Sequence, residues 1–316
     1  MKMKWAGVMP ATTTAFDEQL NIDHAFVARH AKWLIDNGCT GIVTPGSLGE
    51  SATLSFDEKL ALWKTVIDAV GERVPVVAAV ASLSTAEAVR LAQRAADVGC
   101  TGLMVLPPYV YRSDWREMKA HIDAVFRATK LSCMLYNNPV AYGTDFLPQQ
   151  IAEVAVEHEN LEAVKESSTD VRRITWIREL IGDRLAIFVG VDDVIVEGVL
   201  MGAVGWIAGL VNAFPRESVD LFNYAMNGEK EKAVELYNWF LPLLRMDTVP
   251  KFVQLIKLVQ EEVEMGSARV RPPRMELVGD ELEQALKVIR HAIANKPNLV
   301  NSANPEIMSN RMTGST

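Results

Sequence analysis

The chain has 316 residues, 49% of them hydrophobic, so it can build the core of one large α/β barrel or of two ordinary domains. Its formal net charge is −8 and no tract is rich in lysine or arginine, which argues against nucleic acid and anionic membranes as partners, because both select clustered positive charge. The three cysteines, Cys39, Cys100 and Cys133, match no metal-binding spacing and indicate a reduced, cytoplasmic protein. No apolar run approaches the ~18 residues of a membrane-spanning helix.

Short apolar runs recur along the chain, and each is followed by a segment with helical periodicity. The predicted strands lie within residues 6–16, 41–46, 74–82, 102–109, 131–139, 161–168, 185–193 and 202–210. The phrases DNGCTGIV and DVGCTGLMV echo one another, as expected for a repeated unit. Eight strands that alternate with helices predict an α/β fold, a (β/α)8 barrel. An open doubly wound sheet is the alternative, but no G-x-G-x-x-G follows the first strand.

The chain divides into three predicted regions. Residues 1–214 form the barrel, and residues 215–296 contain only amphipathic helical patterns and form a C-terminal helical extension. Residues 297–316 are polar, lack periodicity and are predicted to be disordered.

The carboxyl ends of the predicted strands carry the candidate catalytic residues, as expected for a barrel of this kind. Lys165 ends the apolar run 161–164, Tyr136 lies in the phrase YNNP, and Ser47 lies in the glycine loop GSLGES. Burial disfavours a charged amine, so a buried lysine can attack a carbonyl and form an imine. A tyrosine can pass protons, while Ser47 and turn N–H groups can hold a carboxylate.

Each of these residues also has a structural interpretation. Lys165 can be one half of an ion pair with Glu166 or another carboxylate, and Tyr136 can be a core aromatic residue. We expect Asp192 and Asp193 to cap the following helix rather than bind a metal. No histidine accompanies the strand ends, so neither a metal site nor a serine-histidine relay is expected.

The loop GSLGE, the tyrosine in YNNP and the lysine in VKESS resemble the superfamily of dihydrodipicolinate synthase and N-acetylneuraminate lyase, from about Trp5 to residue 277. The resemblance implies that Lys165 forms the imine, that Tyr136 shuttles protons, and that no cofactor is needed. It also implies a homo-oligomer, a dimer or tetramer, in which a tyrosine after the fourth strand reaches a neighbouring site. The residues that it implies for substrate binding are Ser47, Leu48, Gly46, Gly190, Ile207, Tyr109 and Tyr111.

Departures from the superfamily pattern bear on the substrate. Ala141 stands where dihydrodipicolinate synthases carry an arginine, Leu48 replaces a second hydroxyl, and Val110 takes the place of a relay tyrosine, although Tyr111 is available as a substitute. Without the guanidinium, a second carboxylate lacks its bidentate partner.

The phrases VLPPYVYRSDW, LYNNPVAYGTDF and VKESSTDVRRI resemble the deaminases that convert 1-pyrroline-4-hydroxy-2-carboxylate to 2,5-dioxopentanoate and ammonia in hydroxyproline breakdown. The predicted substrate is therefore a small cyclic imine or keto acid. The alternatives are another 2-keto acid aldolase, a 2-keto-3-deoxy sugar-acid dehydratase, dihydrodipicolinate synthase itself, or a non-catalytic ligand-binding relative.

Overall fold

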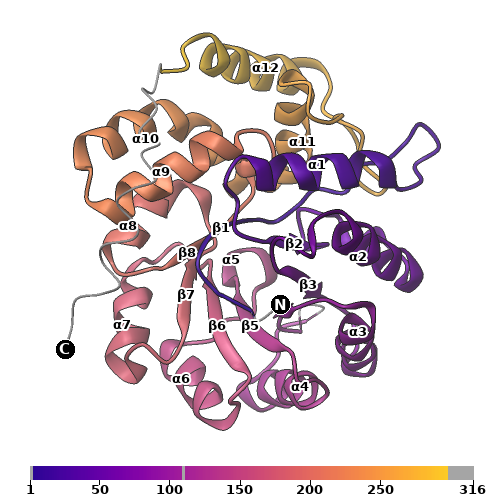
Figure 1. Ribbon diagram of the computed structural model, residues 1–316, viewed down its shortest axis with the longest axis vertical. Coiled ribbons are helices and arrows are strands. Elements are labelled where there is room, and N and C mark those ends of the chain that lie inside the picture. The colour runs from indigo at the N-terminus through magenta and orange to yellow at the C-terminus, as the bar shows by residue number, and fades with distance from the viewer. Residues whose placement is uncertain (1–2, 109–110, 298–316) are drawn as a thin grey trace.

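The computed structural model describes residues 3–108 and 111–297. Eight parallel strands form one sheet in the order β1-β8-β7-β6-β5-β4-β3-β2, and a bridge between Ala11 and Val43 joins its two edges (Figure 1). The strands are β1 (Gly7–Pro10), β2 (Ile42–Thr44), β3 (Val76–Val80), β4 (Gly102–Val105), β5 (Ser132–Asn137), β6 (Leu161–Glu166), β7 (Ala186–Val189) and β8 (Gly205–Ala208). The predicted (β/α)8 barrel is confirmed.

Helices surround the barrel. They are α1 (His24–Asp36), α2 (Phe56–Val70), α3 (Thr85–Val98), α4 (Trp115–Arg127), α5 (Pro139–Tyr142), α6 (Pro148–Glu157), α7 (Arg172–Ile181) and α8 (Ile195–Leu200). Side-chain caps fix several of their first turns: Asp23 accepts from the Phe26 N–H, and Ser84 accepts from the Glu87 N–H. Of the helices in the described ranges, none combines the length and the apolar composition that crossing a bilayer requires.

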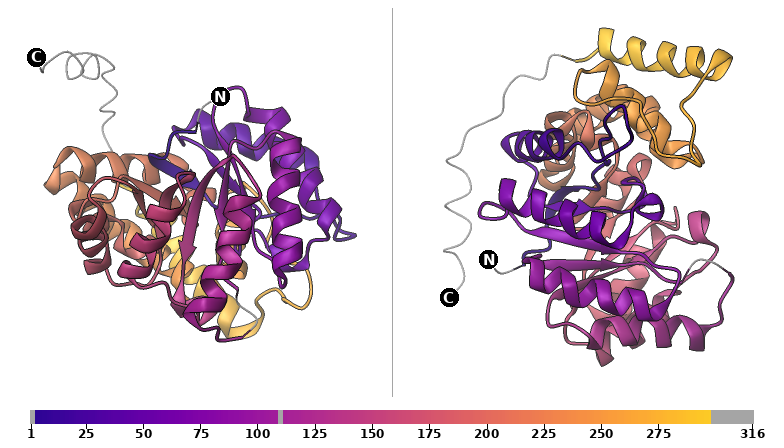
Figure 2. Two further views of the ribbon diagram at one scale, coloured as in Figure 1. Left: turned by 90° about the horizontal axis from the view of Figure 1, so that it is seen from below. Right: turned by 90° about the vertical axis from the view of Figure 1, so that its right-hand side faces the viewer.

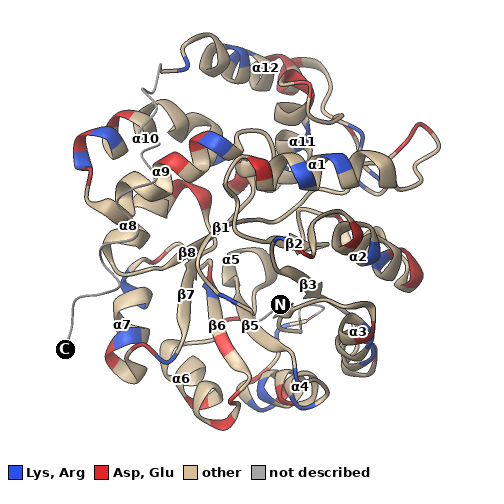
Figure 3. Ribbon diagram, in the orientation of Figure 1, with Lys and Arg blue, Asp and Glu red and all other residues tan. Residues whose placement is uncertain are grey.

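Charge is distributed unevenly between strands and helices. Figure 3 shows lysine, arginine, aspartate and glutamate mainly on the outer helices, with the strands largely uncharged. Of the eight strands, β6 alone carries charged residues, namely Glu162, Lys165 and Glu166. Because strands of a parallel barrel are buried on both faces, a charged strand is an exception to the usual apolar composition.

Within the described residues, four α-helices follow the last strand: α9 (Pro215–Asn227), α10 (Lys230–Leu244), α11 (Phe252–Glu262) and α12 (Gly279–Ala294). Figure 1 and the right-hand view of Figure 2 place α11 and α12 beyond α1, on one side of the barrel. Between α10 and α11 the chain makes a short 3-10 turn, η4 (Arg245–Thr248). Except for Pro297, the tail predicted to be disordered lies outside the described residues.

Candidate active site at the carboxyl ends of the strands

Lys165 is a buried amine that forms no ion pair within the described residues. It pairs in register with Tyr136 on β5 and with Phe188 on β7, and only 6% of its surface is exposed. Its Nζ lies 4.2 Å from the centre of the Tyr136 ring and donates no hydrogen bond to any residue in the described ranges. Burial lowers the pKa of Lys165 to about 8, although the negative charges of Asp247 and Asp192 oppose the shift.

The adjacent carboxylate, Glu166, hydrogen-bonds to groups other than Lys165. Its oxygens accept hydrogen bonds from Asn137 Nδ2 at 3.1 Å and from the Ser168 N–H at 2.6 Å. Successive side chains of a strand point to opposite faces, so Glu166 cannot follow Lys165 into the mouth of the barrel. The interpretation of Lys165 as an ion-pair partner of Glu166 is therefore wrong.

Gly190 lies against Lys165, as the resemblance implies. A Cβ at position 190 would lie 2.6 Å from Lys165 Cε and 2.0 Å from Ser167 Oγ, so no larger residue fits. The Ser167 hydroxyl is 1% exposed and interacts with the Tyr136 hydroxyl. Ile207 is buried on β8 and pairs in register with Met9, so it belongs to the barrel wall next to β7.

Tyr136 is a buried phenol that keeps its proton. Its hydroxyl accepts from Asn138 Nδ2 at 2.9 Å, and burial raises its pKa to about 12. The Tyr142 ring lies edge-on to it, with 6.0 Å between the ring centres. Tyr142 in turn hydrogen-bonds through its hydroxyl to Ser47. Tyr136, Tyr142 and Ser47 thus form one cluster of hydroxyl groups next to Lys165.

Sequence reasoning did not select Tyr142. The available signal was its place in the loop NNPVAYGTD, which follows Tyr136 and also contains Ala141. Asn138 caps the short helix α5 by accepting from the Ala141 N–H, and this turn carries Tyr142 over the barrel mouth. Ala141 itself is exposed.

The glycine loop after β2 presents Ser47 and Leu48. The Gly46 carbonyl accepts from the Ser51 N–H and the Ser47 carbonyl accepts from the Glu50 N–H, which closes a tight turn. Leu48 is 4% exposed, and its N–H has no hydrogen-bond acceptor among residues 3–108 and 111–297. A buried, unused N–H beside Ser47 is a suitable donor for a carboxylate.

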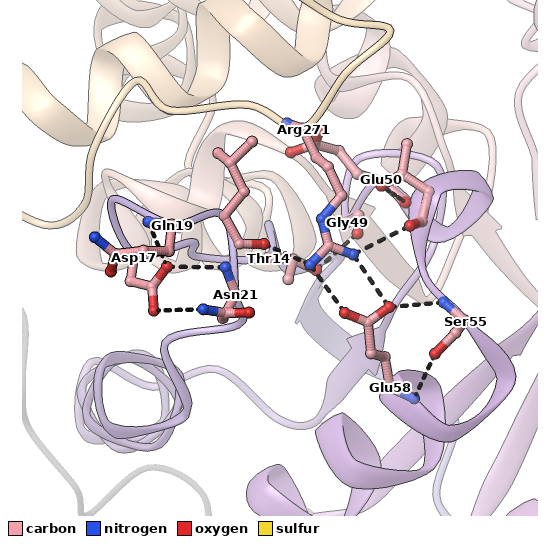
Figure 4. Close-up of polar contacts among 11 residues, drawn as sticks. Thr14, Asp17, Gln19, Asn21, Gly49, Glu50, Ser55, Glu58 and Arg271 are labelled. Atoms are coloured by element: carbon pink, nitrogen blue, oxygen red, sulfur yellow. Dashed lines mark hydrogen bonds and ion pairs between the residues drawn. The ribbon is translucent and has the colours of Figure 1, made fainter.

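The far side of this loop is anchored to the C-terminal extension (Figure 4). Glu50 is buried and accepts from Lys257 Nζ at 2.5 Å and from the Arg271 N–H at 2.9 Å. The Arg271 guanidinium pairs with Glu58, and Thr14 donates to the Gly49 carbonyl at 2.7 Å. These long-range contacts fix the position of Ser47 relative to Lys165.

Two aspartates lie at the end of β8. Asp192 accepts from Trp206 Nε1 at 2.9 Å and from the N–H groups of Gly209 and Leu210. It therefore joins the loops after β7 and β8, and the prediction that it caps the following helix is wrong. The other aspartate, Asp247, comes from η4 in the extension and was not predicted.

The structure describes one of the two tyrosines that follow β4 and were expected to bind substrate. Tyr109 and Val110 lie outside the described residues, and Tyr111 is 54% exposed. The role that the resemblance implies for them remains an expectation about neighbouring subunits.

One group in the described ranges has the composition of a metal site: Asp123, Glu157 and His158. The Lys119 ammonium already pairs with Asp123 at 3.1 Å and also with Glu157. His158 Nε2 lies 2.7 Å from Asp123. The cluster is thus an ion-pair network between α4 and α6.

A parallel barrel that holds an unpaired, buried lysine beside a phenol defines the class of imine-forming lyases. The sequence model of the Dihydrodipicolinate synthetase family matches residues 4–292, and the chain belongs to this family. It is similar to the 4-hydroxy-tetrahydrodipicolinate synthase of Methanocaldococcus jannaschii, with 32% identity over 76% of this chain and 82% of the relative. It is also similar to that of Natronomonas pharaonis, with 32% identity over 90% of this chain and 97% of the relative.

Solved structures agree with this assignment. The crystal structure of a dihydrodipicolinate synthase from Bacillus anthracis has a TM-score of 0.87 and 28% identity, and the match covers 93% of this chain and 99% of the other. The 4-hydroxy-tetrahydrodipicolinate synthase from Methylacidiphilum fumariolicum also has a TM-score of 0.87, with 27% identity, and covers 92% of this chain and 98% of the other.

Proposed function

We propose that this family member is a deaminase that converts 1-pyrroline-4-hydroxy-2-carboxylate to 2,5-dioxopentanoate and ammonia. The proposal rests on the negative charge of the site. Two carboxylates, Asp192 and Asp247, act electrostatically on Lys165, and the loop beside Tyr136 presents Ala141 and Tyr142 where synthases carry an arginine. An acidic site suits a substrate with one carboxylate and a basic nitrogen better than a dicarboxylate.

The first step is imine exchange. The neutral amine of Lys165 attacks C2 of the cyclic imine, the bond from C2 to the ring nitrogen breaks, and the ring opens to leave an amine on C5. Ser47 and the Leu48 N–H hold the C2 carboxylate. The lysine imine then accepts the electrons released when a proton leaves C3, which produces an enamine.

The enamine expels the C4 hydroxyl, with a proton supplied by Tyr136, so that water leaves. Proton transfers along the conjugated chain convert the C5 amine to a C5 imine. Hydrolysis of that imine releases ammonia, and hydrolysis of the lysine imine releases 2,5-dioxopentanoate. One water is lost and two are consumed, so the net reaction adds one water, and Lys165 returns to its starting state.

Incubation with 1-pyrroline-4-hydroxy-2-carboxylate tests the proposal. We expect ammonia and 2,5-dioxopentanoate in equal amounts, and no ammonia from a Lys165→Ala variant. Turnover of pyruvate with aspartate semialdehyde, or cleavage of a 2-keto-3-deoxy sugar acid, in the absence of ammonia release would contradict it.

A synthase or aldolase reaction is the second candidate. Arg112 favours it, because its Nε lies 3.7 Å from the position of a Cβ on Gly143, directly after Tyr142. In that reaction Arg112 would pair with a second substrate carboxylate. An Arg112→Leu variant distinguishes the two, since it would impair the synthase reaction and leave deamination unchanged.

We also propose that the chain forms a homo-oligomer through the face that surrounds the barrel mouth. Three large apolar side chains that follow β3, β4 and β5 are exposed: Leu83 (70%), Tyr111 (54%) and Val140 (69%). Exposed apolar residues that cluster on one face are typical of an interaction surface. Light scattering after gel filtration would show a dimer or tetramer, and a monomer would contradict this proposal.

A further inference from the structure

The extension contributes one side chain to the mouth of the barrel. The Asp247 carboxylate lies against Gly209, the residue after β8: a Cβ on Gly209 would lie 2.1 Å from Asp247 Oδ1 and 2.9 Å from Oδ2. The N–H of the same glycine donates to Asp192. Two carboxylates from distant parts of the chain therefore meet at one backbone position.

The two carboxylates differ in the hydrogen bonds that they accept. Asp192 is fully buried, and its oxygens accept from Trp206, Gly209 and Leu210. Asp247 is half-buried and accepts no hydrogen bond from the residues in the described ranges. A carboxylate held in place without donors retains its full capacity to bind a ligand.

Asp247 also lies near the groups that the proposed reaction uses. Its charge acts on both Lys165 and Tyr136, which are buried in the barrel mouth, and the Ser167 hydroxyl interacts with Tyr136 rather than with Asp247. An unbonded carboxylate therefore lies beside the reactive lysine and the phenol.

We propose that Asp247 is a catalytic and specificity residue that gives a proton to the substrate nitrogen and then binds the resulting ammonium. The inference rests on the proposed deaminase function. In the ring-opening step Lys165 loses two protons, and both pass to the departing nitrogen as the bond from C2 breaks. Asp247 supplies the third proton, so the products are the lysine imine, an ammonium on C5 and the Asp247 carboxylate.

The electrostatics of the pocket suit this exchange. Burial and the nearby charge of Asp192 raise the pKa of Asp247 well above its ordinary value, so it can hold a proton until the nitrogen accepts it. The ion pair that forms is charge-assisted and desolvated, which makes it strong. A keto acid without a nitrogen gains nothing from Asp247, because no group on it accepts the proton and then pairs with the carboxylate.

Asp247→Asn tests the assignment, because it keeps the shape of the side chain and removes both proton and charge. Two rates are measured from pH 7 to pH 9, on either side of the Lys165 pKa of about 8: ammonia release from 1-pyrroline-4-hydroxy-2-carboxylate, and formation of the borohydride-trapped adduct with pyruvate. We expect kcat/KM for the pyrroline to fall between about 10- and 100-fold, while the pyruvate adduct forms at a rate close to that of the wild type. The pyruvate rate also confirms that the variant is folded.

Asp193→Asn is the matched control, because it removes the same charge from a half-buried aspartate that faces Arg245 instead, with 3.9 Å between Asp193 Oδ2 and Arg245 Nε. Its pyruvate rate should equal that of the wild type, and its pyrroline rate should fall far less than in Asp247→Asn, because Asp193 acts on Asp247 only through its charge. Equal losses for pyrroline and pyruvate in Asp247→Asn would overturn the inference in favour of a role in positioning Lys165, and two unchanged rates would show that Asp247 does not touch the substrate. Failure of the wild type itself to release ammonia would instead overturn the proposed function and this inference with it.

Discussion

Two buried lysines, Lys165 and Lys257, differ in the polar groups that surround them. Lys257 is 2% exposed and is bound to Glu50 at 2.5 Å and to the Arg269 carbonyl at 2.8 Å. Lys165 is 6% exposed and has neither a carboxylate in contact nor a carbonyl acceptor among the described residues. Each lies over an aromatic ring, Phe16 for Lys257 and Tyr136 for Lys165.

The difference shows how one side chain serves structure and the other chemistry. Burial lowers the pKa of both lysines, but the directly bonded Glu50 holds Lys257 in its charged form. The carboxylates near Lys165 act without a direct bond, so its amine becomes neutral at a lower pH than that of an ordinary lysine. A bonded ammonium anchors a loop, whereas an unbonded amine can attack a carbonyl carbon.

The largest expected effect is the loss of activity in Lys165→Ala. Without the amine no imine forms, so we expect kcat to fall by about 10⁴-fold or more. Because Lys165 has no bonded partner, the free energy of unfolding should change by less than about 1 kcal/mol. Steady-state kinetics and urea unfolding measure the two quantities. A large loss of stability would mean that Lys165 has a structural role like that of Lys257.

Lys257→Met should show the converse. It leaves Glu50 buried without its partner, so the free energy of unfolding should fall by about 3–5 kcal/mol. Adding Glu50→Gln should restore part of that loss, because the double variant no longer buries an unpaired charge. Equal unfolding curves for wild type and Lys257→Met would show that Lys257 does not have the structural role that distinguishes it here from Lys165.

Tyr136→Phe tests whether the Tyr136 hydroxyl is the proton donor. The variant keeps the ring over which Lys165 lies and removes the hydroxyl, so we expect kcat to fall by about 10²- to 10³-fold while the lysine can still be trapped as an adduct. Tyr224→Phe is a matched control, since Tyr224 is a buried tyrosine on α9. Comparable losses in the two variants would show that the Tyr136 hydroxyl has no special role.

The pH dependence should be the smallest effect. With a pKa of about 8, Lys165 is mostly protonated at pH 7 and mostly neutral at pH 9, so adduct formation should rise about tenfold over that interval. Stopped-time borohydride trapping with pyruvate measures the rate. A rate that stays flat to pH 9 and rises only near the ordinary lysine pKa would show that Lys165 is charged in the protein.

Strand periodicity and the strand-end rule sufficed to predict the barrel and to bring Lys165 and Tyr136 together. The predicted run 6–16 was longer than β1 (Gly7–Pro10), because the loop beyond the strand is also buried in the barrel mouth. Asp192 was expected to cap the helix that follows it, but its carboxylate accepts instead from the N–H groups of Gly209 and Leu210 after β8.

The parts of the site that were missed depend on long-range side-chain contacts. Lys257 and Glu50 are 207 residues apart, and Asp247 reaches Gly209 only because η4 turns back toward β8. No local pattern encodes such pairs, since helix and strand periodicities report which face is buried and not which partner covers it. Tyr142 was missed for a related reason, because the path of the loop after β5 sets its orientation.

The central claim is that Lys165, and not Lys257, is the reactive amine. Borohydride reduction in the presence of 1-pyrroline-4-hydroxy-2-carboxylate or pyruvate, followed by peptide mapping, tests it most directly. The account predicts one covalent adduct per chain from either compound, located on Lys165. An adduct on Lys257 or on another lysine, or no adduct with either compound, would contradict it.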